Sequence, residues 1–309
     1  MIPVQTNRSN ALPHSLAAVH QATTIGRIAS CAHRAVLAEL MLSPKPGLVD
    51  QRNCGAHYDM NLQTFLASAR VIAPWWSHFV EIGYAYAQVP ERNFLPLARP
   101  GGVLCEQAML QATGGINTHK GAIFSLGLLC SAAGRLLAKR IELSRERICS
   151  AVSRICVGLV DRELSSRDTA NTAGERSFRI YGFTGARGEA ASGYELVRAV
   201  ALPVYERLRF DGAGEDVALL QVLLHLLAVN DDTNLVSRGG LAGLHYVREY
   251  AKALLREGGA LAPDGLRKMK AFDDTLIAHH LSPGGTADLL SVAWFLARFP
   301  TVDGEMETQ

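Results

Sequence analysis

The sequence lacks the patterns that mark several common enzyme classes. Its six cysteines include no C-x-x-C pair, and the chain has no H-E-x-x-H motif or His-rich cluster of the kind that binds zinc. It has no G-x-S-x-G elbow of a serine hydrolase and no G-x-x-x-x-G-K-[ST] P-loop. Because most of the cysteines lie in apolar helical runs, we interpret them as small buried residues in a reducing compartment.

The chain also lacks an excess of charge of one sign and a hydrophobic run long enough to cross a membrane. It has 31 basic and 29 acidic residues, a net charge of +2, so no strong field favours nucleic acid or an anionic membrane. The most apolar windows, residues 121–134 and 218–229, are shorter than the roughly 20 residues that a bilayer requires. The first 24 residues have one positive side chain, Arg8, and no apolar stretch of signal-peptide length. We expect a soluble, cytoplasmic protein that binds neither nucleic acid nor a membrane.

Strand signals are nearly absent, whereas helical periodicity extends over most of the 309 residues. The segment 215–230 is apolar on all sides, which is typical of a helix buried in the middle of a bundle. No linker or repeat marks a boundary, so we predict a single all-α catalytic domain at 25–300, a bundle of roughly ten or more helices around this central helix. Residues 1–24 are predicted to be a poorly ordered tail or the start of the first helix, and 301–309 a C-terminal tail. Residues 89–100 are predicted to form a loop, and 165–184 a long ordered loop around a short helix. The predicted helices span 15–41, 62–88, 103–112, 118–139, 144–163, 188–209, 215–230, 239–257, 264–280 and 286–299.

Five polar, glycine-flanked segments lie against these apolar helices. Polar groups there cost free energy unless something pairs with them. A helix start offers free N–H groups and the positive end of a dipole, so a bound anion is the expected partner. A site made from all five segments would be built from interhelix loops and helix N-termini and would need the whole chain as one unit. The segments are residues 43–50, 117–121, 185–189, 231–240 and 282–286.

Each segment also has an interpretation that needs no ligand. Lys45, between two prolines, is typical of a stiff interhelix turn, although Asp50 and His57 follow in the same loop. His119 can be a hydrogen-bonded core histidine. Its position at a helix start after two glycines, where Asn117 or Thr118 can cap, favours an anion site.

Four carboxylates in these and neighbouring segments indicate a metal. Glu175 and Glu189 lie beside glycines, and singly each can be a helix-start acid that the dipole favours. Asp231 and Asp232 follow the C-terminal end of the predicted central helix, where negative charge is unfavourable without a cation. Together the four are a hard oxygen set suited to Mg²⁺ that carries substrate phosphates. The sequence therefore predicts one site for a polyphosphate and a metal.

Several of these segments resemble the triphosphoribosyl-dephospho-CoA synthases, which make the prosthetic-group precursor of citrate lyase and have a close relative that serves malonate decarboxylase. The resemblance runs in order from about residue 30 to 299, and residues 161–164 and 172–176 favour the citrate lyase branch. The matching motifs are S-P-K-P-G-L-V-D at 43–50, G-A-H-Y-D-M at 55–60, G-I-N-T-H-K-G-A-I-F at 115–124, T-G-A-R-G-E at 184–189, D-T-N at 232–234 with R-G-G at 238–240, and S-P-G-G-T-A-D-L-L at 282–290.

The resemblance implies that the 2′-hydroxyl of 3′-dephospho-CoA attacks C1 of the ATP ribose. Adenine leaves and 2′-(5″-triphosphoribosyl)-3′-dephospho-CoA is formed, with Mg²⁺ bound together with ATP. The downstream holo-acyl-carrier-protein synthase of citrate lyase or malonate decarboxylase would receive this product.

Combined with the residue patterns, this chemistry assigns expected roles. Catalysis is expected from Asp50, His119, Glu189 and Asp232, with Asp50 or His119 as the base for the hydroxyl or as the acid for the leaving adenine. Phosphate or nucleotide binding is expected from Lys45, Asn117, Thr118, Lys120, Arg187, Arg238, Gly284 and Gly285. The expected metal ligands are Glu175, Glu189, Asp231 and Asp232.

Two alternative functions remain at this stage. One is an all-α, Mg²⁺-dependent hydrolase of ADP-ribose-type N-glycosides, which would use the same carboxylates to deliver water. The other is a non-catalytic nucleotide-binding accessory protein, which would bind dephospho-CoA without turnover.

Overall fold

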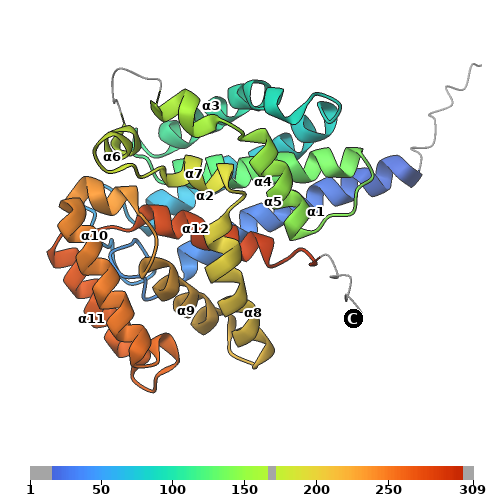
Figure 1. Ribbon diagram of the computed structural model, residues 1–309. Helices are drawn as coiled ribbons and strands as arrows, with labels where there is room; N and C mark the ends of the chain where they lie inside the picture. The colour runs from blue at the N-terminus through green and yellow to red at the C-terminus, as the bar shows by residue number, and fades with distance from the viewer. Residues whose placement is uncertain (1–15, 166–171, 302–309) are drawn as a thin grey trace, which may run out of the picture.

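The computed structural model describes residues 16–165 and 172–301, and within these ranges the chain forms helices and no strand. The prediction of an all-α bundle is confirmed (Figure 1). The predicted tails at 1–15 and 302–309, and residues 166–171 of the predicted long loop, lie outside the described residues. The helices are α1 (Leu16–Met41), α2 (Leu62–Ala85), α3 (Leu95–Ala112), α4 (Lys120–Ala138), α5 (Arg145–Ile155), α6 (Ala173–Tyr181), α7 (Gly185–Ala191), α8 (Leu202–Phe210), α9 (Glu215–Leu227), α10 (Thr233–Arg256), α11 (Gly265–Ala278) and α12 (Gly284–Leu296).

Three helices make up the interior of the bundle. The predicted central helix, α9, buries nine of its thirteen residues, α12 buries ten of thirteen and α4 buries fourteen of nineteen. In Figure 1, α4 lies behind α7 and between α2 and α5, and α12 crosses the middle of the molecule. One hydrophobic core joins residues from Ile25 in α1 to Leu296 in α12. The N-terminal ends of α4 and α12 are thereby fixed inside the protein, which is where the site described below is found.

Glycines allow α2 and α4 to pack closely against each other. A Cβ atom at Gly83 would lie 2.0 Å from the carbonyl oxygen of Ser131, and one at Gly134 would lie 2.0 Å from that of Val80. Real Cβ atoms do not come so close, so only glycine permits this separation of the two backbones. The position of α4, and of its N-terminus, depends on these contacts.

A buried arginine ties the other end of α4 to the end of α2. The guanidinium of Arg135 donates hydrogen bonds to the backbone oxygens of Tyr86, Ala87 and Val89, and it lies 4.7 Å from the ring centre of Phe94. A cation at a helix C-terminus complements the dipole and satisfies carbonyls that the helix leaves unpaired.

Three sequence predictions of helix boundaries were wrong. The predicted helix 188–209 is interrupted at residues 192–194, where Gly193 and Tyr194 have positive φ, and the second half starts with a π-helical turn over Val197–Ala201. The predicted helix 144–163 ends at Ile155, and Gly158 has positive φ before a second π-helical segment, Asp161–Ser165. The predicted loop at 89–100 is already helical from Leu95, because Pro96 lies in the first turn, where a helix tolerates proline.

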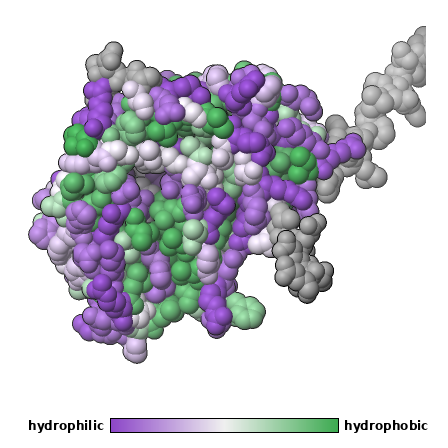
Figure 2. Space-filling model, in the orientation of Figure 1, coloured by the Kyte–Doolittle hydropathy of each residue, from purple (hydrophilic) through white to green (hydrophobic). Residues whose placement is uncertain are grey.

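The surface shows mixed polarity. Figure 2 shows polar side chains over most of this face, with apolar ones between them, chiefly in the lower half. By length and composition one helix of the described residues, Lys120–Ala138, could cross a membrane, but most of it is buried among other helices, as in the core of a bundle.

Candidate functional site

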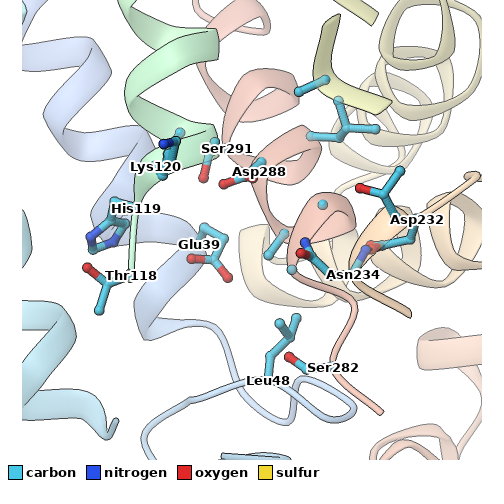
Figure 3. A pocket seen from close by; sticks show the side chains of 18 of the residues that line it. Glu39, Leu48, Thr118, His119, Lys120, Asp232, Asn234, Ser282, Asp288 and Ser291 are labelled. Atoms are coloured by element: carbon cyan, nitrogen blue, oxygen red, sulfur yellow. The ribbon is translucent and has the colours of Figure 1, made fainter. Parts of the chain in front are cut away.

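All five polar segments meet at one cavity of about 400 Å³. Residues 45, 48 and 49 of the first segment form part of its wall, and the 117–121, 185–189, 231–240 and 282–286 segments supply most of the remainder. The sequence separates the first and last of these by more than 230 residues, but the close-up shows their side chains around a shared space (Figure 3). The predicted convergence of the segments is therefore present in the structure.

Three helices direct their N-termini at this cavity. Its wall includes the first residues of α4 (Lys120 and Gly121), of α10 (Thr233 and Asn234) and of α12 (Gly284 and Gly285). The first N–H groups of an α-helix have no partner within the helix, and the dipole places partial positive charge there. Several such ends around one space are suited to an anion larger than a single phosphate.

Asp232 links two of these helix ends. Its Oδ1 caps α10 by accepting hydrogen bonds from the backbone N–H groups of Asn234 and Leu235. Its Oδ2 accepts from the backbone N–H and the hydroxyl of Thr286, at 2.7 and 2.8 Å. Burial raises the pKa of this carboxyl, although the four hydrogen bonds act in the opposite direction. Both oxygens of Asp232 are thus used to join α10 to α12.

Asp288 and Glu39 also line the cavity, and the sequence reasoning did not identify either of them. Asp288, in the second turn of α12, accepts a hydrogen bond from the backbone N–H of Ala122 at the start of α4. Burial, with the nearby charges of Glu39 and Asp232, raises its pKa well above the usual range. One signal was present in the sequence: Asp288 is the only charged residue in the apolar helix α12. Glu39 carried no such signal, because it lies among ordinary residues near the end of α1.

Lys45 is almost fully buried and forms an ion pair with Glu39, with 2.5 Å between Nζ and Oε1. Its side chain therefore points inward, not outward as in the exposed-turn interpretation. A lysine that is buried against a single carboxylate retains two ammonium hydrogens. It is therefore a cation within the wall of the cavity.

Glu189 projects from α7 with one carboxylate oxygen, Oε2, buried and without a hydrogen-bond partner. Burial raises its pKa to about 7. The backbone N–H of Leu196 opposes this shift, and the charge of Glu195 adds to it. A carboxyl group with a pKa near neutrality can exchange a proton in either direction at physiological pH. Glu189 is the residue of this cavity best suited to acid–base chemistry.

His119 is buried just before α4 and its pKa falls to about 3, first because of burial and then because of the charge on Lys45. Its Nδ1 lies 2.6 Å from the hydroxyl of Ser68, and its Nε2 has no partner. The hydroxyl oxygen of the adjacent Thr118 is likewise buried without a partner. A histidine with this pKa is neutral and weakly basic at pH 7. It can therefore form hydrogen bonds through its ring nitrogens but is poorly suited to accept a proton.

Three of the predicted site residues do not line this cavity. Asp50 holds its own loop together by accepting hydrogen bonds from Ser43 Oγ and from the backbone N–H groups of residues 45, 52 and 53. Glu175 forms a capping box with Thr172 at the start of α6. Arg187 points to the other side of α7, where its Nε donates to Glu163 at 2.8 Å.

Four other predicted site residues line the cavity, but their side chains pair with other groups of the protein. Asp231 is half exposed and pairs with Arg248 at 2.7 Å, so the expected cation beside it is an arginine of α10. Arg238 donates to the backbone oxygens of Ala56 and His280. Lys120 lies 3.0 Å from Glu106, and the side chain of Asn117 accepts a hydrogen bond from the Lys120 backbone.

The carboxylates do not form a preassembled metal centre. In the described parts of the chain, no group of three or more His, Cys, Asp or Glu side chains is arranged to hold a metal ion. Mg²⁺ commonly binds through one or two carboxylates together with substrate phosphates and water. Asp288, crowded by like charges, and the unpartnered oxygen of Glu189 suit that mode, whereas both oxygens of Asp232 are already occupied.

The cavity is thus lined by helix N-termini, a buried lysine and several carboxyl groups, and comparison with known proteins gives the family. Residues 25–305 match the CitG family, described as ATP:dephospho-CoA triphosphoribosyl transferase. A 2-(5″-triphosphoribosyl)-3′-dephosphocoenzyme-A synthase of Klebsiella pneumoniae is 53% identical over 274 residues, which cover 88% of this chain and 91% of the relative. A probable synthase of the same name from Salmonella choleraesuis is 49% identical over 300 residues, 97% of each chain, and one from Citrobacter koseri is 47% identical over 302 residues, covering 98% of this chain and 97% of the relative. No solved structure gives a significant match.

The chain belongs to the ATP:dephospho-CoA triphosphoribosyl transferase family, and the resemblance found in its motifs is confirmed. It is an enzyme, a transferase that uses ATP and dephospho-CoA as substrates. These findings favour neither the hydrolase nor the non-catalytic accessory protein.

Proposed function

We propose that the cavity of about 400 Å³ is where the triphosphoribosyl group of ATP passes to the 2′-hydroxyl of 3′-dephospho-CoA, with release of adenine. One observation supports this location above all. The N-termini of α4, α10 and α12 and the buried Lys45 face the same space as the carboxylates Glu39, Glu189 and Asp288. Donors for a triphosphate and negative charge for a reacting sugar are thus available side by side.

The triphosphate is held by the start of α12 and by Lys45. The N–H groups of Gly284 and Gly285 are the first of their helix, and both residues line the cavity. Lys45 adds a positive charge from the wall of the same cavity. Fixing all three phosphates directs attack to the sugar and away from phosphorus, because only the anomeric carbon then lies in reach of the hydroxyl.

The carboxylates act on the ribose. Displacement of adenine at C1 of ATP passes through a state with oxocarbenium character, which nearby negative charge stabilises. Glu189 takes the proton from the 2′-hydroxyl of dephospho-CoA as the new bond to C1 forms and the bond to adenine breaks, and this proton then passes to the departing adenine, which leaves as the neutral base. His119, neutral at pH 7, positions the hydroxyl or the adenine through its free Nε2.

Asp288, beside the start of α4, would hold a Mg²⁺ ion bound together with ATP. Such an ion would neutralise part of the charge on the triphosphate. The position of Asp288 supports this assignment, because the charges of Glu39 and Asp232 lie close to it and a cation would offset their repulsion.

The product, 2′-(5″-triphosphoribosyl)-3′-dephospho-CoA, is the precursor of an acyl-carrier prosthetic group. We place the reaction in the cytoplasm, where ATP and CoA precursors are made. The product would pass to the holo-acyl-carrier-protein synthase of citrate lyase or of malonate decarboxylase.

Incubation with ATP, Mg²⁺ and dephospho-CoA, followed by chromatography of adenine and mass spectrometry of the product, tests this proposal. We expect adenine only when dephospho-CoA is present, in equal amount to a product that is heavier by one triphosphoribosyl group. Adenine release without dephospho-CoA would indicate hydrolysis. Binding of both substrates without turnover would indicate an accessory role. Asp232→Asn should reduce adenine release by loosening the junction between α10 and α12.

A further inference from the structure

A second cavity of about 380 Å³ adjoins the first on the other side of α7. Lys120, Gly121 and Ala186 form part of the wall of both cavities, so the start of α4 separates them only partly. We propose that this second cavity receives the pantetheine arm of dephospho-CoA, with Arg99 and Arg187 beside its pyrophosphate. The inference rests on the proposed function and identifies where its acceptor substrate is bound.

The chemistry of the acceptor requires such a space. The 2′-hydroxyl and the 5′-pyrophosphate of dephospho-CoA are on the same ribose, and the pantetheine arm continues from the pyrophosphate. When the hydroxyl is in the first cavity, the pyrophosphate must therefore lie within one sugar length of it, and the arm must extend beyond. The shared wall at the start of α4 is where the adjoining cavity opens.

The lining of the second cavity suits an uncharged chain. Most of its wall consists of apolar residues of α2, α3 and α4, such as Leu95, Ala98, Val103 and Phe124. Val103 is 46% exposed although it is large and apolar. Ligand cavities are commonly apolar with a few polar groups that fix orientation.

Of the five charged residues that line the second cavity, Glu106 and Lys120 pair with each other, and the other three form one cluster. Glu163 accepts hydrogen bonds from Arg99 and from Arg187, which holds the two guanidinium groups together. Each arginine has five N–H donors, so this single carboxylate leaves most of them for another acceptor. Two arginines in fixed positions are typical of pyrophosphate recognition. Arg187, predicted from sequence to bind phosphate, would bind that of the acceptor and not that of ATP.

Gly102 offers a direct test, because a Cβ atom at this position of α3 meets no other atom within 4 Å and it lies on the second cavity. Gly102→Leu adds a side chain at the wall of the second cavity, from a position where the Cβ itself meets no atom. We expect the KM for dephospho-CoA to rise about tenfold or more, while the KM for ATP changes less than about twofold. The matched control is Gly26→Leu in α1, where a Cβ also meets nothing within 4 Å, and both KM values should stay unchanged.

Two further measurements make the result decisive. ADP is dephospho-CoA without its pantetheine arm. As an acceptor for the wild type, ADP should have a higher KM than dephospho-CoA. In Gly102→Leu the two KM values should be much closer to each other. Val103→Glu should raise the KM for dephospho-CoA as well, because it places a charge on the path of an apolar chain. Unchanged KM values for dephospho-CoA in both folded variants would refute the subsite while leaving the proposed function intact. No transfer by the wild type would instead refute the proposed function.

Discussion

The carboxylate of Asp288 lies directly over the backbone of Gly121. A Cβ atom at residue 121 would come within 1.8 Å of Asp288 Oδ2, a separation that no real side chain can adopt. The absence of a side chain at Gly121 is what lets an acid of α12 reach the N-terminus of α4. This contact joins two of the three helix ends that surround the cavity.

Gly121→Ala should therefore disable the site while the fold persists. The new methyl group must displace Asp288, and a shift of about 1 Å at a reacting centre can cost about a hundredfold in rate. We expect a loss of that size in kcat for adenine release with an unchanged far-UV circular dichroism spectrum. Gly26→Ala in α1 is the control, because its Cβ meets nothing within 4 Å. Equal rates for the two variants would show that Asp288 has no role that depends on its position.

Activity should depend on pH through Glu189. As a base Glu189 must be ionised, so the rate should rise with pH around its pKa of about 7 and level off above it. Glu189→Gln should abolish the rise together with most of the activity. Glu195→Gln is the matched control, and it should stay active with a profile moved to lower pH, because the charge of Glu195 raises the pKa of Glu189. A wild-type rate that is independent of pH between 6 and 8 would exclude Glu189 as the base.

The same carboxyl group should lower the free energy of unfolding at neutral and alkaline pH. Because its folded pKa is higher than its unfolded value, the folded state holds the proton more tightly. Stability then falls as the pH rises from the unfolded value to about 7. Glu189→Gln should consequently melt at a higher temperature than the wild type at pH 8 and at nearly the same temperature at pH 4. Differential scanning fluorimetry at both pH values measures this difference, and an equal shift at both would contradict it.

Lys45 and Glu39 should be coupled in stability. Lys45→Met leaves the buried Glu39 carboxylate without its partner, which costs about 3 kcal/mol in comparable buried pairs. The double variant Glu39→Gln/Lys45→Met removes the stranded charge and should recover most of the free energy of unfolding in urea titrations. Neither protein should transfer the triphosphoribosyl group at a normal rate, because the cation on the cavity wall is missing. A double variant as unstable as Lys45→Met would show that the loss has another cause.

Metal removal should stop the reaction without unfolding the protein. EDTA should abolish adenine release, and Mg²⁺ should restore it, because the charge on ATP is then neutralised again. Asp288→Asn should shift the dependence of the rate on free Mg²⁺ to higher concentration, by about tenfold. Asp231→Asn serves as its control, since the Asp231 carboxylate already pairs with Arg248, and its Mg²⁺ dependence should match the wild type. Full activity in EDTA would exclude the ion from the reaction.

The helices were predictable from sequence where the helix preference of the residues agrees with how the helix packs in the structure. The apolar segment at 215–230 and the glycine-led segment at 284–296 both give buried helices. The breaks were less predictable, because Tyr194 adopts a positive φ that sequence alone does not favour. Prolines 96 and 100 indicated a loop, but they lie in or near the first turns of α3, where packing outweighs their usual effect.

The meeting of the polar segments at one cavity was predictable, because glycine-flanked polar segments against apolar helices are costly without a partner. The roles of individual acids were harder to predict. Asp50 and Glu175 are acids in segments that resemble a binding site. In the structure, however, their carboxylate oxygens accept hydrogen bonds from nearby backbone N–H groups, which the sequence alone does not show. Glu39 is the opposite case, since its place at the cavity depends on how the end of α1 meets the loop that carries Lys45.

The carboxylates at the helix ends have a consequence for which nucleotides can enter. Asp232 already occupies N–H groups of α10 and α12, and Asp288 one of α4, so the protein supplies its own counter-ions where a triphosphate would bind. Where these carboxyl groups are ionised, bare ATP would meet like charge at the helix ends. A magnesium–ATP complex carries less negative charge than bare ATP, so we expect these acids to favour the complex.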